Sequence, residues 1–246
     1  MSERVSWEVT AMTHGESLAM AIEATQRALE QRLRDAMAPH QDPLRPRDNY
    51  AATDTFVASA SRHLAATEAV LVAQVRHTVP GGRKLSHDYL VGARRLEHAL
   101  ARVKGKLYGE AHKIHLTWPS LWAAARQCLD EHNRMETGLV EALLRHTDTV
   151  TVDGLARRIF DAETRGPTRP HPWTPHTGPL GATARRMWAL ADRFWDDAEG
   201  RVIPAPVPPP ARRHDSLVAQ YFVADPRFDA SASILAHRKR PLPEAG

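Results

Sequence analysis

Two residues of one predicted helix have the types and the spacing of a buried polar site. Residues 121–143 carry leucine and alanine at steps of three and four, which predicts a helix with one buried stripe. His132 and Glu136 fall on that stripe, four residues apart, so both side chains should point inward. Burying an imidazole beside a carboxylate is costly without a partner, which could be a metal ion, a cation from another helix, or each other. The spacing therefore predicts a site without naming a reaction.

Helical periodicity dominates the rest of the chain, and two-residue alternation is scarce. The predicted helices cover residues 16–37, 51–78, 85–115, 118–146, 152–164 and 182–199. Prolines interrupt the chain between the first two helices, and a Pro-Gly-Gly sequence ends the second helix at residues 80–82. Four long helices joined by short loops between residues 51 and 164 are typical of an up-down bundle. We therefore predict an all-α fold, with a four-helix bundle, an additional N-terminal helix and a C-terminal aromatic helix.

Changes in composition predict four segments. These are residues 1–49, an N-terminal helix and linker; 50–166, the four-helix bundle; 167–203, a Pro- and His-rich connector with a docking helix; and 204–246, a Pro-rich linker and a partly disordered tail. We expect Trp188, Phe194 and Trp195 to hold the docking helix on the bundle. A protein partner is expected to bind through this helix and the tail.

The bulk composition restricts the classes of function. A chain of 246 residues with 42% hydrophobic residues can bury a substantial core. Its formal charge of +4 is spread among well-mixed acids and bases, which argues against nucleic-acid binding. Cys128 is the single cysteine, so no internal disulfide can form, and this fits a reducing compartment. With no signal-peptide pattern and no run of eighteen apolar residues, we expect a cytoplasmic protein without a membrane span.

Candidate metal ligands occur on each of the four predicted bundle helices. They are His63, His98, His132, Glu136 and Glu163. Imidazole and carboxylate groups suit iron, manganese or zinc, and helical bundles hold such ions in their cores. His98 lies about 200° around the helix from Leu96, so it faces away if Leu96 and the neighbouring leucines face the core.

Three short motifs carry a resemblance to a known family. Residues 61–64 read SRHL, residues 131–136 read EHNRME, and residues 168–176 read TRPHPWTPH. On the first two motifs, residues 51–164 resemble the hemerythrin-like (HHE cation-binding) domain. The third is similar to a connector of a divergent, actinobacterial-type branch of that family. The resemblance implies a helical bundle that holds non-haem iron.

The resemblance also implies a ligand set, which this sequence matches only in part. Family members with a di-iron centre use five histidines and two bridging carboxylates. His63, His98 and His132 match histidine positions, Glu136 stands where the family has a second histidine, and Glu163 matches a carboxylate. Two further ligand positions are Arg102 and Arg158, whose guanidinium groups cannot bind a cation. The predicted ligand set is therefore incomplete.

Three functions remain open on the sequence. The first is a hemerythrin-like protein that binds a cation such as iron, in a reduced mononuclear site of His63, His132 and Glu136. The second is a metal-free helical scaffold or interaction module, in which Arg102 or Arg158 pairs with the core carboxylates. The third is an enzyme that uses iron for peroxide chemistry, which the incomplete ligand set supports least.

The sequence gives weaker evidence of a functional site for the histidines outside this set of candidate ligands. His112 and His115 lie three residues apart at the end of a predicted helix and could bind a metal together. His171 and His176 flank Trp173 in the connector, where a rigid loop that caps the bundle is the expected role.

Overall fold

The structure is a computed structural model that describes residues 14–38, 48–109, 115–148, 152 and 154–210. These residues fold into α-helices, a short π-helix and connecting segments, so the all-α prediction is confirmed. The elements are α1 (His14–Met37), α2 (Asp48–Thr67), the π-helix η1 (Glu68–Val72), α3 (Ala73–Thr78), α4 (Gly82–Leu107), α5 (Trp118–His146), α7 (Leu155–Arg165) and α8 (Gly178–Glu199). Among the described residues, no helix is long and apolar enough to cross a membrane.

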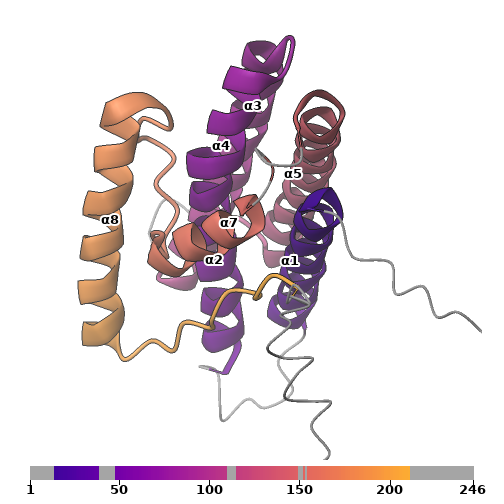
Figure 1. Ribbon diagram of the computed structural model, residues 1–246. Helices are drawn as coiled ribbons and strands as arrows, with labels where there is room; N and C mark the ends of the chain where they lie inside the picture. Colours follow the sequence, from indigo (N-terminus) through magenta and orange to yellow (C-terminus); the bar gives the residue numbers. More distant parts are fainter. Residues whose placement is uncertain (1–13, 39–47, 110–114, 149–151, 153, 211–246) are drawn as a thin grey trace, which may run out of the picture. The chain divides into compact units, whose positions relative to one another are not determined.

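Helices α1, α2, α4 and α5 pack side by side around one hydrophobic core (Figure 1). Helix α1 packs along α2 and α5, α4 packs along α5 and α3, and α7 lies across α2 and η1. The first helix was expected to lie outside the bundle, but Leu18, Ile22, Leu29 and Leu33 of α1 lie in the same core as the later helices. Helix α1 therefore helps to enclose any site in the interior.

The start of α5 and the turn before α4 show why these helices begin where they do. Thr117 caps α5 by accepting a hydrogen bond from the Ser120 N–H at 3.3 Å, and Pro119 occupies the first turn. Before α4, Gly81 adopts a positive φ of 72°. A Cβ atom on Gly82 would lie 2.1 Å from the carbonyl oxygen of Val75, so only glycine fits the close approach of α3 and α4.

The predicted helix 51–78 is interrupted by the π-helix η1. A π-turn adds one residue to a turn of helix and often occurs at functional sites. Here it leaves the side chains of Thr67 and Glu68, two consecutive residues, both buried. Thr67 contacts Glu136 of α5, whereas Glu68 contacts His176 of the connector.

Helix α8 attaches to the other helices mainly through polar contacts. Asp192 accepts hydrogen bonds from the backbone N–H groups of Thr168 and Arg169, both at 2.9 Å. His171 stacks on Trp188 with ring centroids 4.2 Å apart. The prediction that three aromatic residues dock this helix on the bundle is wrong for Phe194 and Trp195, which are 66% and 52% exposed, and Trp188 contacts the connector instead.

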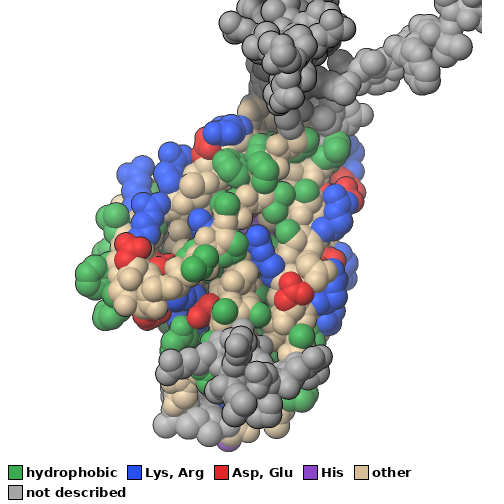
Figure 2. All heavy atoms as spheres, turned by 90° about the horizontal axis from the view of Figure 1, so that it is seen from below, with side chains coloured by type: hydrophobic (Ala, Val, Ile, Leu, Met, Phe, Trp, Pro, Cys, Tyr) green, Lys and Arg blue, Asp and Glu red, His purple; other side chains and the backbone are tan. Residues whose placement is uncertain are grey.

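The molecular surface mixes charges of both signs. On the face shown in Figure 2, lysine and arginine side chains lie among acidic and hydrophobic ones. This distribution agrees with the small formal charge of +4. Residues 211–246 of the predicted linker and tail, 204–246, lie outside the described residues.

Candidate metal centre

Three side chains from two helices meet in the core. His63 of α2 and His132 and Glu136 of α5 each offer a ligand atom, and these atoms lie within 4.8 Å of one another. All three side chains are at most 1% exposed. The helical step of four residues places His132 and Glu136 on the same face of α5, and α2 packs His63 against them. The structure therefore brings together the three residues of the reduced site considered from the sequence.

Glu136 accepts hydrogen bonds from three residues, which lie on helices α1 and α2. The hydroxyl of Thr67 donates to its Oε1 at 2.8 Å, and the amide of Gln26 on α1 donates to its Oε2 at 2.9 Å. Nε2 of His63 lies 2.9 Å from Oε1 and 3.1 Å from Oε2. Burial disfavours the charged carboxyl group, but His63 outweighs it and lowers the pKa of Glu136 to about 2. Glu136 is therefore an anion in the protein interior.

His63 lies between two carboxyl groups. Its Nδ1 is 2.6 Å from Oε1 of Glu163 on α7, while its Nε2 faces Glu136. Burial opposes protonation of the ring, but the two carboxyl groups outweigh it and raise the pKa of His63 to about 10. Without a metal ion, the imidazolium of His63 is the positive charge that balances the buried acids.

His132, unlike His63, makes no hydrogen bond to a carboxyl group. Both of its ring nitrogens are buried without a hydrogen bond, and Nε2 lies 3.9 Å from Oε2 of Glu136. Its ring packs against His63 and Tyr89, with centroid distances of 5.7 and 5.2 Å. Burial lowers the pKa of His132 to about 4, so the ring is neutral and has a free lone pair.

The spacing of these atoms suits a small metal ion. Two ligands on a tetrahedral ion with bonds of about 2.0–2.2 Å are separated by roughly 3.4 Å. The pair from His63 to Glu136 is slightly closer than this, and the pair from His132 to Glu136 slightly wider. Glu163 holds the other nitrogen of His63, as second-shell carboxylates hold metal-bound histidines.

His98 is not part of this centre. It lies on the outer side of α4, where its ring contacts Trp173 at a centroid distance of 4.7 Å. Leu96 and Leu100 face the core, so a residue two positions from each faces outward, as the helical wheel indicated. The prediction that His98 is a metal ligand is wrong.

The predicted pairing of arginines with the core acids is also wrong. Arg102 and Arg158 are exposed, whereas Glu136 and Glu163 are buried. The arginine that reaches Glu163 is Arg62, whose Nε donates to the backbone carbonyl of Glu163 at 3.1 Å. The positive charge inside the core belongs to His63.

The sequence analysis missed Gln26, Thr67 and Tyr89 as neighbours of the centre. Gln26 lies one turn from both Ile22 and Leu29 on the buried side of α1, so its position on an apolar stripe was a detectable signal. Tyr89 precedes Ala93 and Leu96 at the same helical spacing on α4. These residues are neighbours of the centre only because particular helices pack together. The apolar pattern of a single helix does not specify which helices do so.

A second buried polar cluster lies where the connector meets α4 and η1. Nδ1 of His176 is 2.9 Å from Glu68, and Nε2 is 3.5 Å from Glu97. Burial and the nearby Glu68 raise the pKa of Glu97 to about 7. Burial opposes protonation of His176, but Glu68 and Glu97 outweigh it and raise its pKa. His176 thus attaches the connector to η1 and α4, as expected for a rigid loop that caps the bundle.

The other histidines form no centre of this kind in the described residues. His171 stacks on Trp188 and contacts Asp192 at 3.2 Å, and His115 is exposed. His112 lies outside the described residues, so the predicted pair of His112 and His115 cannot be placed.

Comparison with known proteins identifies no relative. No protein-family model, no curated protein and no solved structure matches the chain. The function therefore has to be argued from the buried centre of His63, His132 and Glu136.

Proposed function

We propose that this protein binds one transition-metal ion between His63, His132 and Glu136. The observation that carries the proposal is the state of His132, whose two ring nitrogens are buried without a partner. A buried polar group left without a hydrogen bond costs about 1–3 kcal/mol. A metal ion near Glu136 would satisfy the lone pair of His132 and the carboxylate together.

The donor set favours iron, with zinc as the next candidate. Two imidazoles and one carboxylate with open positions are the donors of many non-haem iron sites. Zinc also accepts this set and keeps a fourth position for water or substrate. Glu163 would orient His63 and strengthen it as a ligand. When bound, the ion would supply Lewis acidity and, for iron, redox chemistry.

The resemblance to hemerythrin-like domains supports the same proposal. In that interpretation the helices form an up-down four-helix bundle, and the ion serves storage, sensing, or the handling of oxygen or nitric oxide. A full di-iron centre is not proposed, because it needs five histidines and two carboxylates. The described core brings together His63, His132, Glu136 and Glu163.

Titration of metal-free protein with Fe(II) under anaerobic conditions, and separately with Zn(II), tests the proposal. The native protein should bind one equivalent of the ion. The His132→Leu variant should lose this binding yet unfold at the same or a higher denaturant concentration than the metal-free native protein, because an unpaired buried polar group is removed. The matched control His98→Leu should retain the binding.

A metal-free helical scaffold is the second candidate, and it also has a specific observation in its favour. His63 already neutralises the core acids through contacts of 2.6 Å with Glu163 and 2.9 Å with Glu136. The scaffold predicts that neither Fe(II) nor Zn(II) binds stoichiometrically. Equal binding by the native protein and by His132→Leu would likewise contradict the proposed site.

A further inference from the structure

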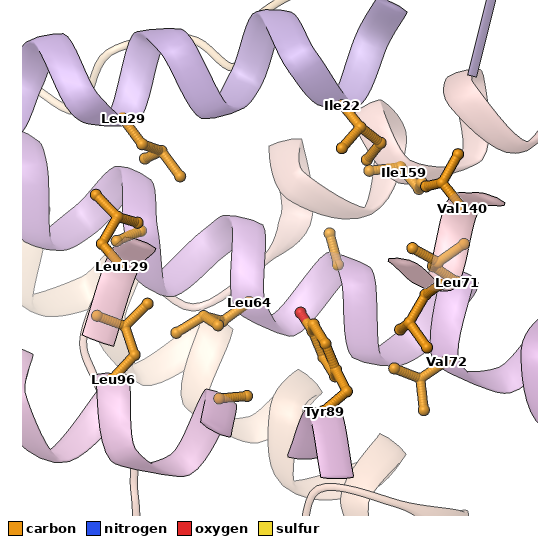
Figure 3. Close-up of a cluster of buried hydrophobic side chains, with 14 of the residues drawn as sticks. Ile22, Leu29, Leu64, Leu71, Val72, Tyr89, Leu96, Leu129, Val140 and Ile159 are labelled. Carbon is orange, nitrogen blue, oxygen red and sulfur yellow. The ribbon is translucent and has the colours of Figure 1, made fainter. Parts of the chain in front are cut away.

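Tyr89 is a second buried polar residue without a hydrogen-bond partner beside the proposed metal site. It lies on α4, is 1% exposed, and its hydroxyl group makes no hydrogen bond. The ring centroid is 5.2 Å from that of His132, with an angle of 51° between the planes. Figure 3 shows the hydroxyl group pointing away from α4 into the interior. Two adjacent aromatic residues in one core thus both have unsatisfied polar atoms.

The surroundings of the hydroxyl group connect it to Glu136. Tyr89 interacts with Thr67, and the Thr67 hydroxyl donates to Oε1 of Glu136 at 2.8 Å. Burial and the nearby charges of Glu136 and Glu68 raise the pKa of Tyr89 well above its usual value.

We infer that Tyr89 is the fourth protein ligand of the ion at the proposed site, bound as a phenolate, and that the site takes ferric iron. This inference rests on the proposed function. On binding, the O–H bond of Tyr89 and the Nε2–H bond of the His63 imidazolium break, both protons leave to solvent, and bonds form from the phenolate oxygen and from Nε2 of His63 to the ion. Iron supplied as Fe(III) undergoes no redox change in this step.

Charge balance within the core favours a trivalent ion. The carboxylates of Glu136 and Glu163 and the phenolate of Tyr89 carry three negative charges, and His63 and His132 would bind as neutral imidazoles. A trivalent ion neutralises these groups, whereas a divalent ion balances the two carboxylates only while Tyr89 keeps its proton. Anionic oxygen donors also match a hard, highly charged ion.

The test adds ferric nitrilotriacetate to metal-free native protein and records the visible absorption. Phenolate bound to Fe(III) gives a charge-transfer band, which we expect in the native protein and not in Tyr89→Phe. The variant should bind Fe(III) at least about tenfold more weakly, since loss of even an indirect metal contact costs about 10–100-fold. Tyr50→Phe, which changes a tyrosine that is 44% exposed, is the matched control and should keep the band.

The experiment separates failure of this inference from failure of the proposed function. Tyr89→Phe should still bind Zn(II) through His63, His132 and Glu136, which also shows that the variant is folded. Fe(III) bound by native protein without the band, or a band retained in Tyr89→Phe, would overturn the role of Tyr89 alone. If the native protein binds neither Zn(II) nor Fe(III), the metal site itself is wrong.

Discussion

The core around His63 encloses polar residues in apolar ones, whereas helix α8 buries acidic residues and exposes apolar ones. In the core, His63, His132 and Glu136 are enclosed by hydrophobic side chains. On α8, Asp192 and Asp196 are buried at 2% and 5% exposure, while Leu190 and Phe194 are 67% and 66% exposed.

The difference shows that buried charge serves two purposes in this chain. Asp192 and Asp196 are saturated by backbone N–H groups, a hydroxyl and arginines, including Arg201, which also contacts Asp54 of α2 at 2.9 Å. Such a network attaches one element to another. The α8 network leaves single nitrogens of Arg169, Arg201 and Trp188 unpaired, whereas near His63 both ring nitrogens of His132 and the hydroxyl of Tyr89 have no hydrogen bond.

The largest expected effect is the loss of the charge at the centre of the core. His63→Leu, studied with chelator present, should lower the free energy of unfolding by about 3–5 kcal/mol, because Glu136 and Glu163 remain buried without their counter-charge. Urea denaturation measures this loss, with the outward-facing His98→Leu as control. A loss of less than about 1 kcal/mol would mean that the core acids are neutral without His63.

A smaller and more local effect is expected at the attachment of α8. Asp192→Ala removes the acceptor of the Thr168 and Arg169 N–H groups, at a cost of about 1–3 kcal/mol. Amides of residues 178–199 should then exchange hydrogen faster, whereas those of residues 121–143 should not change. The exposed Asp197 supplies the control variant Asp197→Ala. Equal acceleration in both segments would show that α8 and the core unfold as one unit.

The cluster that joins the connector to α4 should give stability a pH dependence. The pKa of Glu97 rises to about 7 in the folded protein from 4.5, so its contribution is complete below about pH 4.5 and is lost as the pH rises through about 7. The raised pKa of His176 acts in the same direction, starting from 6.5.

Denaturation of the native protein and of Glu97→Gln at pH 5 and pH 8 measures this dependence. The native protein should lose roughly 1–3 kcal/mol more than the variant between these values. Glu141→Gln, which changes an exposed acid on α5, should behave like the native protein. Parallel pH profiles for Glu97→Gln and the native protein would show that Glu97 titrates normally.

The smallest effect is expected on the exposed side of α8. Phe194→Ser should change the free energy of unfolding by no more than about 0.5 kcal/mol, because the side chain is already 66% exposed. Thermal unfolding checks this, with Phe56→Ser, a fully buried phenylalanine of α2, as the contrasting variant. A large loss for Phe194→Ser would show that another surface covers this side of α8.

The sequence predicted the helices well because their apolar spacing is local. The bounds of α5 agree with the predicted 118–146, since Thr117 caps its start and Pro119 and the leucine stripe lie within it. The interruption at η1 was not predicted, because residues 68–72 have ordinary helix-forming types. Docking of α8 through Phe194 and Trp195 failed because apolar composition alone does not show which side of a helix finds a partner.

By itself, the sequence determined that His132 and Glu136 share the buried face of one helix and that His63 lies on the buried face of another, because helical periodicity fixes the side of each residue. Only the tertiary structure decided that Glu163 holds His63 and that Gln26, Thr67 and Tyr89 surround the centre. The reason is physical. Which helices pack together, and at what rotation, depends on how all their side chains fit at once.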